Sequence, residues 1–196
     1  QSPYSFEKGK LIVREMTDLL TLDLVDKGLV TDQMVLTIGY DIENLSNPEI
    51  KKYYKGPVTT DHYGRRVPKH AHGTENLGRR TSSTRLIMDA VTRLYDRIVD
   101  KNLLIRRVYI TACHVQEAGA AAGEETFEQL DLFTDYEALQ RQKEKEEAEL
   151  ERERKMQKAM LDIKKKFGKN AILKGMNLED GAMTLKRNGQ IGGHKA

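Results

Sequence analysis

The sequence predicts an α+β fold in which a small mixed or antiparallel sheet is backed by two helices and followed by a long charged helix and a basic tail. Three patterns predict this fold. Apolar residues recur at helical spacing between residues 87 and 98, alternate with polar residues between 105 and 115, and become sparse after residue 134. The apolar face of the helix needs a surface to cover it, and the alternating segment that follows supplies a strand of such a sheet.

Two amphipathic helices are expected before residue 100. The first begins after Ser5, a favourable N-cap, and ends at Gly28. Its apolar stripe is formed by Val13, Met16, Leu19, Leu20 and Leu24. The second helix follows Ser82 or Ser83, and its stripe is formed by Ile87, Ala90, Val91, Leu94 and Ile98. Each helix therefore has one face to bury against a sheet.

Three strands are expected at about 33–41, 69–77 and 105–115, and apolar and polar residues alternate in the first and the third. Turn-forming residues interrupt this pattern over residues 44–68, where basic side chains are interleaved with tyrosines, namely Lys51, Lys52, Lys55, Arg65, Arg66, Tyr53, Tyr54 and Tyr63. Such an excursion suits either a nucleic-acid contact or a surface loop whose tyrosines lie over the domain.

The composition allows one domain of roughly 100–150 residues with extensions, not a packed core throughout. Of the 196 residues, 38% are hydrophobic and 32% are charged. No apolar run is long enough for a signal peptide or a membrane span, and the chain begins with Gln1, so we expect part of a longer soluble protein. Cys113 is the single cysteine, which excludes an intrachain disulfide and predicts a cytoplasmic protein.

The net charge of +3 conceals three blocks of opposite sign. Residues 51–107 hold 14 Lys/Arg against 5 Asp/Glu, residues 117–153 hold 4 against 13, and residues 154–196 hold 11 against 3. A basic region on a sheet face is the electrostatic footprint of a protein that binds a phosphate backbone. The acidic block would repel the same polyanion, and we expect it to lie elsewhere.

The corner that opens the second helix is unusual. Residues 77–85 combine hydroxyl groups with arginines, although helix starts favour Asp and Glu because free N–H groups and the helix dipole attract negative charge there. Basic residues at this position make sense if an anion binds, and a solvated basic turn is the alternative. The candidate phosphate contacts are Arg79, Arg80, Thr81, Ser82, Ser83, Thr84 and Arg85, together with Lys69, Arg106 and Arg107.

Here the sequence resembles a known family. Thr81-Ser82-Ser83 leading into the helix, and the later segment from Leu104 to Ile110, are similar to the "little finger" domain of Y-family translesion DNA polymerases, and the resemblance is widest over residues 1–116. In that family the domain is a four-stranded βαββαβ sheet backed by two helices, and its polar face grips the DNA backbone. Primer-template DNA is the partner that the resemblance implies.

The resemblance also implies what the chain lacks. The family's first strand would precede Gln1, so an exposed sheet edge is expected that could dimerise or recruit a strand from a neighbour. The family's nucleotidyl transfer needs acidic residues that hold two Mg²⁺ ions in a palm domain, which nothing in this sequence resembles. We therefore expect DNA binding without catalysis, and no cofactor in this chain.

Residues 117–133 form a linker that ends in a short motif. Its last five residues resemble the pentapeptide with which bacterial proteins bind the sliding clamp, and they are Gln129, Leu130, Asp131, Leu132 and Phe133. Leu132 and Phe133 would anchor in an apolar pocket, and the Gln129 amide would fix the register. Alternatively, the two apolar side chains dock on the domain's own core or staple the next helix.

A capping box from Thr134 to Glu137 opens a helix that is expected over residues 134–167 and ends at Gly168. A solvated helix, partly ordered by neighbours, is favoured over a coiled coil because heptad spacing is not sustained. Residues 168–196 mix Lys and Gly with little apolar content, which predicts a mobile basic tail. This tail also resembles the C-terminal signature of a Gram-positive branch of the same polymerases.

Two other functions remain open from the sequence. One is a free-standing RNA-binding or DNA-binding βαββαβ module, for which only Tyr109 and Tyr40 could present stacking rings on strands. The other is a scaffold protein built on the long helix, a second route to homo-oligomers. A metal site is not predicted, because His62, His70 and His72 lack a further ligand at a suitable spacing.

Overall fold

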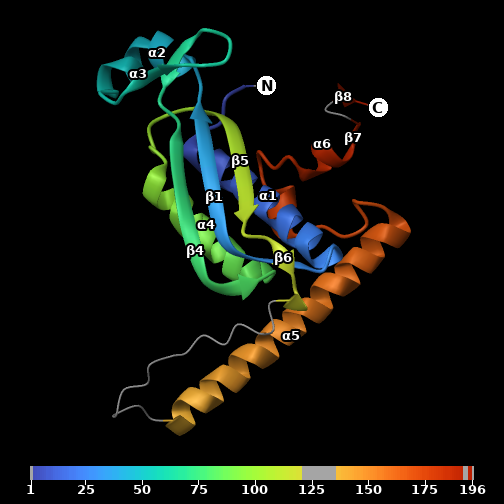
Figure 1. Ribbon diagram of the computed structural model, residues 1–196. Helices are drawn as coiled ribbons and strands as arrows, with labels where there is room; N and C mark the ends of the chain where they lie inside the picture. The colour runs from blue at the N-terminus through green and yellow to red at the C-terminus, as the bar shows by residue number, and fades with distance from the viewer. Residues whose placement is uncertain (1, 121–135, 192–193, 196) are drawn as a thin grey trace.

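The protein is described by a computed structural model that covers residues 2–120, 136–191 and 194–195. Strands β1 (Leu29–Tyr40), β4 (Ala71–Thr81) and β5 (Ile105–Cys113) form an antiparallel sheet in the order β4-β1-β5, and the short β6 (Gln116–Glu117) also pairs with β1. Helices α1 (Phe6–Asp26) and α4 (Thr84–Ile98) lie side by side behind the sheet (Figure 1). The predicted α+β class is confirmed.

The core lies between the sheet and the two helices. Met34, Leu36 and Ile38 of the central strand have no exposed surface, and they meet fully buried side chains of α4 such as Ile87 and Leu94. Burying side chains of this size contributes about 1.5–3 kcal/mol each. β1 is paired on both sides, and β4 and β5 both run antiparallel to it.

Both helices begin and end through local signals. Ser5 and Ser83 are the N-caps, and their hydroxyl groups accept hydrogen bonds from the backbone N–H groups of residues three positions later. Gly28, just beyond α1, has a φ of +67°, a conformation that glycine adopts without strain. The expected stripe of α1 is only partly the buried one, since Leu19 and Leu20 are half-buried whereas Leu11, Ile12 and Leu22 are buried.

The strand expected at residues 69–77 extends further than predicted. β4 continues to Thr81, so Arg79 and Arg80 belong to a strand and not to a turn. The extension includes Gly78 at a φ of +74° and pairs through a register shift between Thr31 and Gln33, which marks a bulge.

The excursion after β1 is structured. It contains the helices α2 (Glu43–Ser46) and α3 (Pro48–Tyr53), followed by a hairpin of β2 (Val58–Thr60) and β3 (Arg66–Pro68).

The outer edge of β5 carries one isolated bridge in the described chain. Tyr4 and Ile105 exchange two backbone hydrogen bonds, of 2.8 and 2.7 Å. The N-terminal segment thus covers one end of the edge that the sequence predicts to be exposed.

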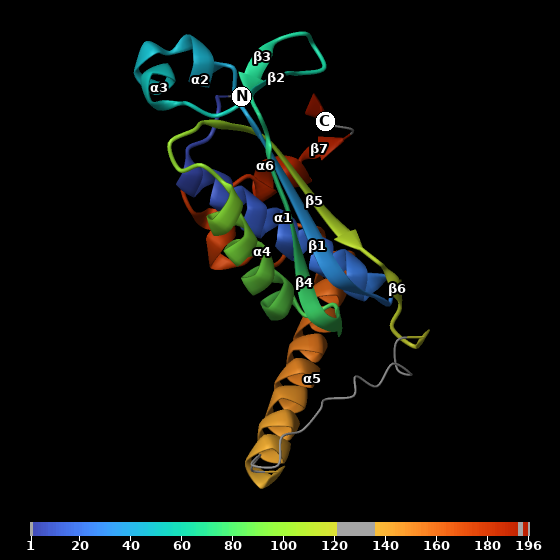
Figure 2. The same ribbon diagram turned by 60° about the vertical axis from the view of Figure 1, so that its left-hand side comes forward.

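The long helix α5 (Tyr136–Phe167) ends at Gly168 as expected, and its N-terminal end projects away from the domain (Figure 2). Its second half packs on the domain and buries Gln157 and Met160. The capping box lies partly outside the described residues.

The prediction of a mobile basic tail after residue 168 is wrong as far as Asn188, where the chain is folded. A 3₁₀ turn η2 (Gly175–Leu178) and a helix α6 (Thr184–Asn188) pack against α1, and a small hairpin of β7 (Gln190–Ile191) and β8 (His194–Lys195) follows. Met176, Asn177 and Thr184 are buried there. Composition missed this docking because it depends on a few polar contacts instead of an apolar stripe.

Candidate nucleic-acid interface

The sheet face opposite α1 and α4 is polar, and we call it the open face (Figure 1). Its side chains alternate with the buried ones of the same strands and lie opposite one another in the strand register. They come from Gln33, Val35, Thr37, His72, Thr74, Asn76, Arg107, Tyr109 and Thr111. Cross-strand hydrogen bonds of 2.8 Å join Thr37 to His72 and Gln33 to Asn76. Tyr109 is 56% exposed and offers the ring of this face to a ligand.

Three of the predicted phosphate contacts form no ion pair with a carboxylate of the described residues. These are Lys69, Arg85 and Arg107. The Arg107 guanidinium lies 5.7 Å from the centre of the Tyr63 ring, a contact that leaves its positive charge in place. Such cations are available to an incoming polyanion without first breaking an ion pair.

The other predicted arginines are engaged by acids of the chain itself. Arg79 pairs with Glu146 of α5, and Arg106 lies 3.6 Å from a carboxylate oxygen of Asp41. Arg80 lies 3.5 Å from Asp32 and donates a 3.0 Å hydrogen bond to the backbone carbonyl that follows β5. All of these pairs are partly exposed, and pairs of this kind contribute only about 0–1 kcal/mol. They can therefore exchange with phosphate at little cost.

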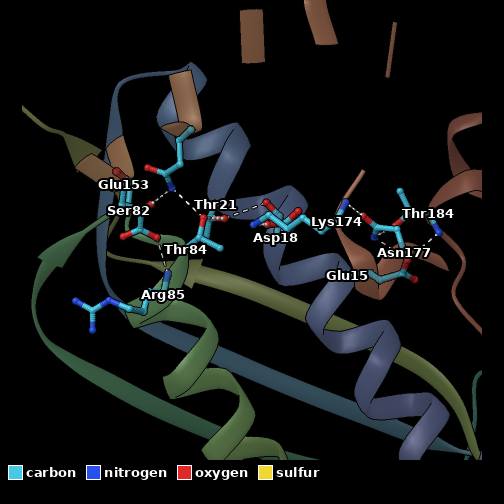
Figure 3. Close-up of polar contacts among 11 residues, drawn as sticks. Glu15, Asp18, Thr21, Ser82, Thr84, Arg85, Glu153, Lys174, Asn177 and Thr184 are labelled. Carbon is cyan, nitrogen blue, oxygen red and sulfur yellow. Dashed lines mark hydrogen bonds and ion pairs between the residues drawn. The ribbon is translucent and has the colours of Figure 1, made fainter. Parts of the chain in front are cut away.

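The start of α4 binds a carboxylate of the chain itself, that of Glu153 in α5 (Figure 3). One carboxylate oxygen of Glu153 accepts a 2.5 Å hydrogen bond from the Ser83 hydroxyl, and the other accepts a 2.8 Å bond from the Arg85 N–H. α4 has no acidic residue in its own first turn. The Glu153 carboxylate therefore stabilises the positive end of the α4 dipole, which no acidic residue in the first turn of α4 does.

A second residue of α5 occupies the rest of the corner. The buried Gln157 amide donates to the Ser82 carbonyl at 3.0 Å and to the Thr84 hydroxyl at 2.9 Å. Thr81 is also buried, and its hydroxyl accepts from the Ser83 N–H. The corner predicted to bind DNA phosphate thus holds α5 in this structure. The absence of an acid in the first turn of α4 was the signal for an anion, but the sequence did not say which one.

A buried polar cluster on α1 was missed altogether (Figure 3). Glu15 has no exposed surface and accepts hydrogen bonds from the Asn177 amide at 3.0 Å and from the backbone N–H groups of Met183 and Thr184 at 2.7 and 3.1 Å. Burial raises the pKa of Glu15, but these hydrogen bonds outweigh it, so the pKa lies below its usual range. Asp18, one turn later, pairs with Lys174. Glu15 and Asp18 lie between the apolar residues of the predicted helix, which was the only signal in the sequence.

The five residues of the clamp-binding motif, from Gln129 to Phe133, lie outside the described residues. Within residues 2–120, 136–191 and 194–195, no group of three or more His, Cys, Asp or Glu side chains could hold a metal ion. No helix in the same part of the chain is both long enough and apolar enough to cross a membrane.

Comparisons of the chain with protein-family models, with curated proteins and with solved structures find no match.

Proposed function

We propose that this chain is the DNA-gripping and clamp-binding C-terminal part of an error-prone Y-family translesion DNA polymerase, acting in DNA repair in the cytoplasm and lacking the catalytic palm. The observation that carries the proposal is the open face of the sheet, which is polar, bears the unpaired cation Arg107 and has both helices on its opposite side. A polar face of this kind can follow a phosphate backbone without reading bases.

The spacing of the cations supports a duplex as the ligand. Arg107 lies opposite Gly39, and Thr81 lies opposite Thr31, so the two basic ends of the sheet are eight residues apart along β1. At about 3.3 Å per residue this is a span of about 26 Å, which is less than one turn of B-DNA, about 34 Å. Phosphates on the two sides of a groove could therefore contact Arg107 at one end and Arg79 and Arg80 at the other.

A salt titration tests the proposal. Binding of a blunt duplex should weaken steeply as salt rises, and Arg107→Ala should reduce the slope of log K against log salt by about 1, because one phosphate contact is lost. Arg152→Ala removes the same charge from the exposed surface of α5 and serves as the control. Absence of duplex binding at low salt, or equal slopes for both variants, would contradict DNA gripping by the open face.

The clamp-binding part is tested separately. A peptide of residues 125–137 should bind the bacterial sliding clamp in calorimetry, because Leu132 and Phe133 supply two apolar anchors. In the whole chain, Leu132→Ala with Phe133→Ala should abolish clamp binding and leave duplex affinity unchanged. A peptide that does not bind would remove the clamp from the proposal while leaving DNA gripping intact.

A free-standing RNA-binding module is the second candidate, and the exposed ring of Tyr109 favours it. Its other candidate ring is not accessible. Tyr40 is only 7% exposed, and its hydroxyl accepts a 2.9 Å hydrogen bond from the Asp100 N–H. Titration of matched single-stranded RNA and primer-template DNA separates the two functions.

A further inference from the structure

A groove of about 520 Å³ lies where the β2–β3 hairpin meets one end of the open face. Its floor includes Thr37, Gly39 and Tyr109, and its far wall includes His62 and Val67 of the hairpin segment. A side chain at Gly39 would approach the Arg107 Cβ to 3.2 Å, so glycine keeps the floor low beside that arginine. The volume lies within the range that holds small organic ligands, about 300–1,000 Å³.

An aromatic ring with two guanidinium groups near it lies beside this groove. The Tyr63 ring lies 5.1 Å from the Arg65 guanidinium and 5.7 Å from that of Arg107, and Tyr63 is 68% exposed. Tyr63 belongs to the hairpin loop, whereas Arg107 belongs to β5, so the arrangement links the loop to the sheet. Exposed rings beside guanidinium groups are the surface on which unpaired nucleobases stack.

The hairpin loop is held in place before any ligand binds. Asp61 accepts two hydrogen bonds from the Arg65 side chain, at 2.9 and 2.7 Å, and its other oxygen accepts 2.9 Å bonds from the N–H groups of Tyr63 and Arg65. The Arg65 side chain is the main cause that lowers the pKa of Asp61 to about 2, so the carboxylate stays charged at neutral pH. A loop that is already ordered loses little entropy on binding.

The charges around the groove nearly balance. Asp41 and Asp61 are each paired with an arginine, Arg106 and Arg65 respectively, which leaves Arg107 as the cation in excess among the lining Asp and Arg residues. One excess cation is too few to hold a duplex by charge alone, whereas two accessible rings can hold bases.

We propose that this groove binds a single-stranded segment of nucleic acid, with unpaired bases stacked on Tyr63 and Tyr109 and a phosphate beside Arg107. The inference rests on the proposed function, because the segment is taken to be the single-stranded continuation of the duplex on the open face. It defines the preferred ligand as a junction between duplex and single strand.

The test compares three ligands by fluorescence anisotropy: a blunt duplex, the same duplex with an oligo(dT) overhang, and free single strands of oligo(dT) and oligo(U). The overhang should raise affinity by about 5-fold or more, because each stacked base contributes at least that factor. Tyr63→Ala should reduce this gain without changing blunt-duplex affinity, and Tyr63→Phe should keep it. Tyr109→Ala should also reduce the gain, measured as the ratio of overhang to blunt-duplex affinity for the same variant.

A matched control lies in the same excursion. Tyr53 is 72% exposed with the Lys52 ammonium 5.8 Å from its ring. Lys52 does not line the groove, whereas Arg65 and Arg107, the two cations near the Tyr63 ring, both do, so Tyr53→Ala should leave the overhang gain intact. Circular dichroism confirms that each variant is folded.

The outcomes separate the two ideas. Equal binding of blunt and overhang duplexes by the unaltered protein, or loss of the gain in Tyr53→Ala, overturns the groove proposal while duplex gripping stands. If duplexes fail to bind but single strands bind through Tyr63 and Tyr109, the proposed function fails and the groove proposal stands. The oligo(dT) and oligo(U) arms then show whether the strand is DNA or RNA.

Discussion

Glu153→Gln should change stability and DNA affinity in opposite directions. The carboxylate holds the start of α4 through the Ser83 hydroxyl and the Arg85 N–H, so it stabilises the docking of α5. The same negative charge lies among the arginines proposed to contact phosphate. Glutamine keeps the shape of the side chain and removes the charge, which separates the two effects.

The magnitudes follow from these contacts. Hydrogen bonds to a charged group contribute about 1.5–3 kcal/mol, compared with about 1 kcal/mol for neutral ones, and the helix dipole adds about 0.3–1 kcal/mol. Glutamine can still make one of the two bonds, so the free energy of unfolding should fall by about 1–2 kcal/mol. A phosphate about 7 Å from the removed charge gains about 0.6 kcal/mol in water, which raises DNA affinity by about 2- to 3-fold.

Urea unfolding followed by circular dichroism measures the first effect, and anisotropy with a blunt duplex measures the second. Glu149→Gln is the matched control, since it removes the same charge from an exposed position of α5 and should change stability by no more than about 0.5 kcal/mol. Unchanged stability in Glu153→Gln would refute the role of this carboxylate as the anion at α4. An equal gain in DNA affinity for both variants would show that only net charge matters.

Three further substitutions probe the packing of α1 and β1. Glu15 has a lowered pKa, so its contribution to stability is present above pH 4.5, its usual pKa, and is lost as pH falls through the lower folded value. Urea unfolding at several pH values should therefore show Glu15→Gln less stable than the unaltered protein at pH 6 and the difference shrinking in acid; a constant difference would contradict this. Gly9→Ala should lower the midpoint of thermal unfolding, because a Cβ there would lie 2.5 Å from Ile105 and 2.8 Å from the Tyr95 hydroxyl. This clash should outweigh the higher helix propensity of alanine. A raised midpoint would show that α1 shifts freely. Leu36→Ala should cost about 2–5 kcal/mol in urea unfolding, and a loss below 1 kcal/mol would mean that the core collapses around the cavity.

Local sequence patterns predicted the main helices and strands of the domain. The positions of α1, α4, β1 and β5 follow from periodicity, and the ends of the helices follow from Ser5, Gly28, Ser83 and Gly168. Each of these signals depends on residues within about one helical turn or on strand alternation. The extension of β4 to Thr81 was not predictable in this way, because it depends on pairing with β1 through a bulge.

For the candidate site, the sequence predicted where an anion binds but not which group supplies it. The sequence indicated that the start of α4 attracts an anion, yet Glu153 lies about 70 positions later, and its arrival depends on how α5 packs on α1. The exposure of Tyr63 beside Arg107 likewise depends on a hairpin folding over the sheet.

The amino-acid sequence by itself determined the fold class, the boundaries of α1 and α4 and the charge blocks, because periodicity, capping and composition act over short distances along the chain. Only the tertiary structure decided which charges meet. The docking of residues 174–188 on Glu15 and Asp18, and the engagement of Arg79 by Glu146, join segments far apart in the chain. Coulomb interactions and hydrogen bonds depend on distance in space, which the fold sets and the order of residues does not.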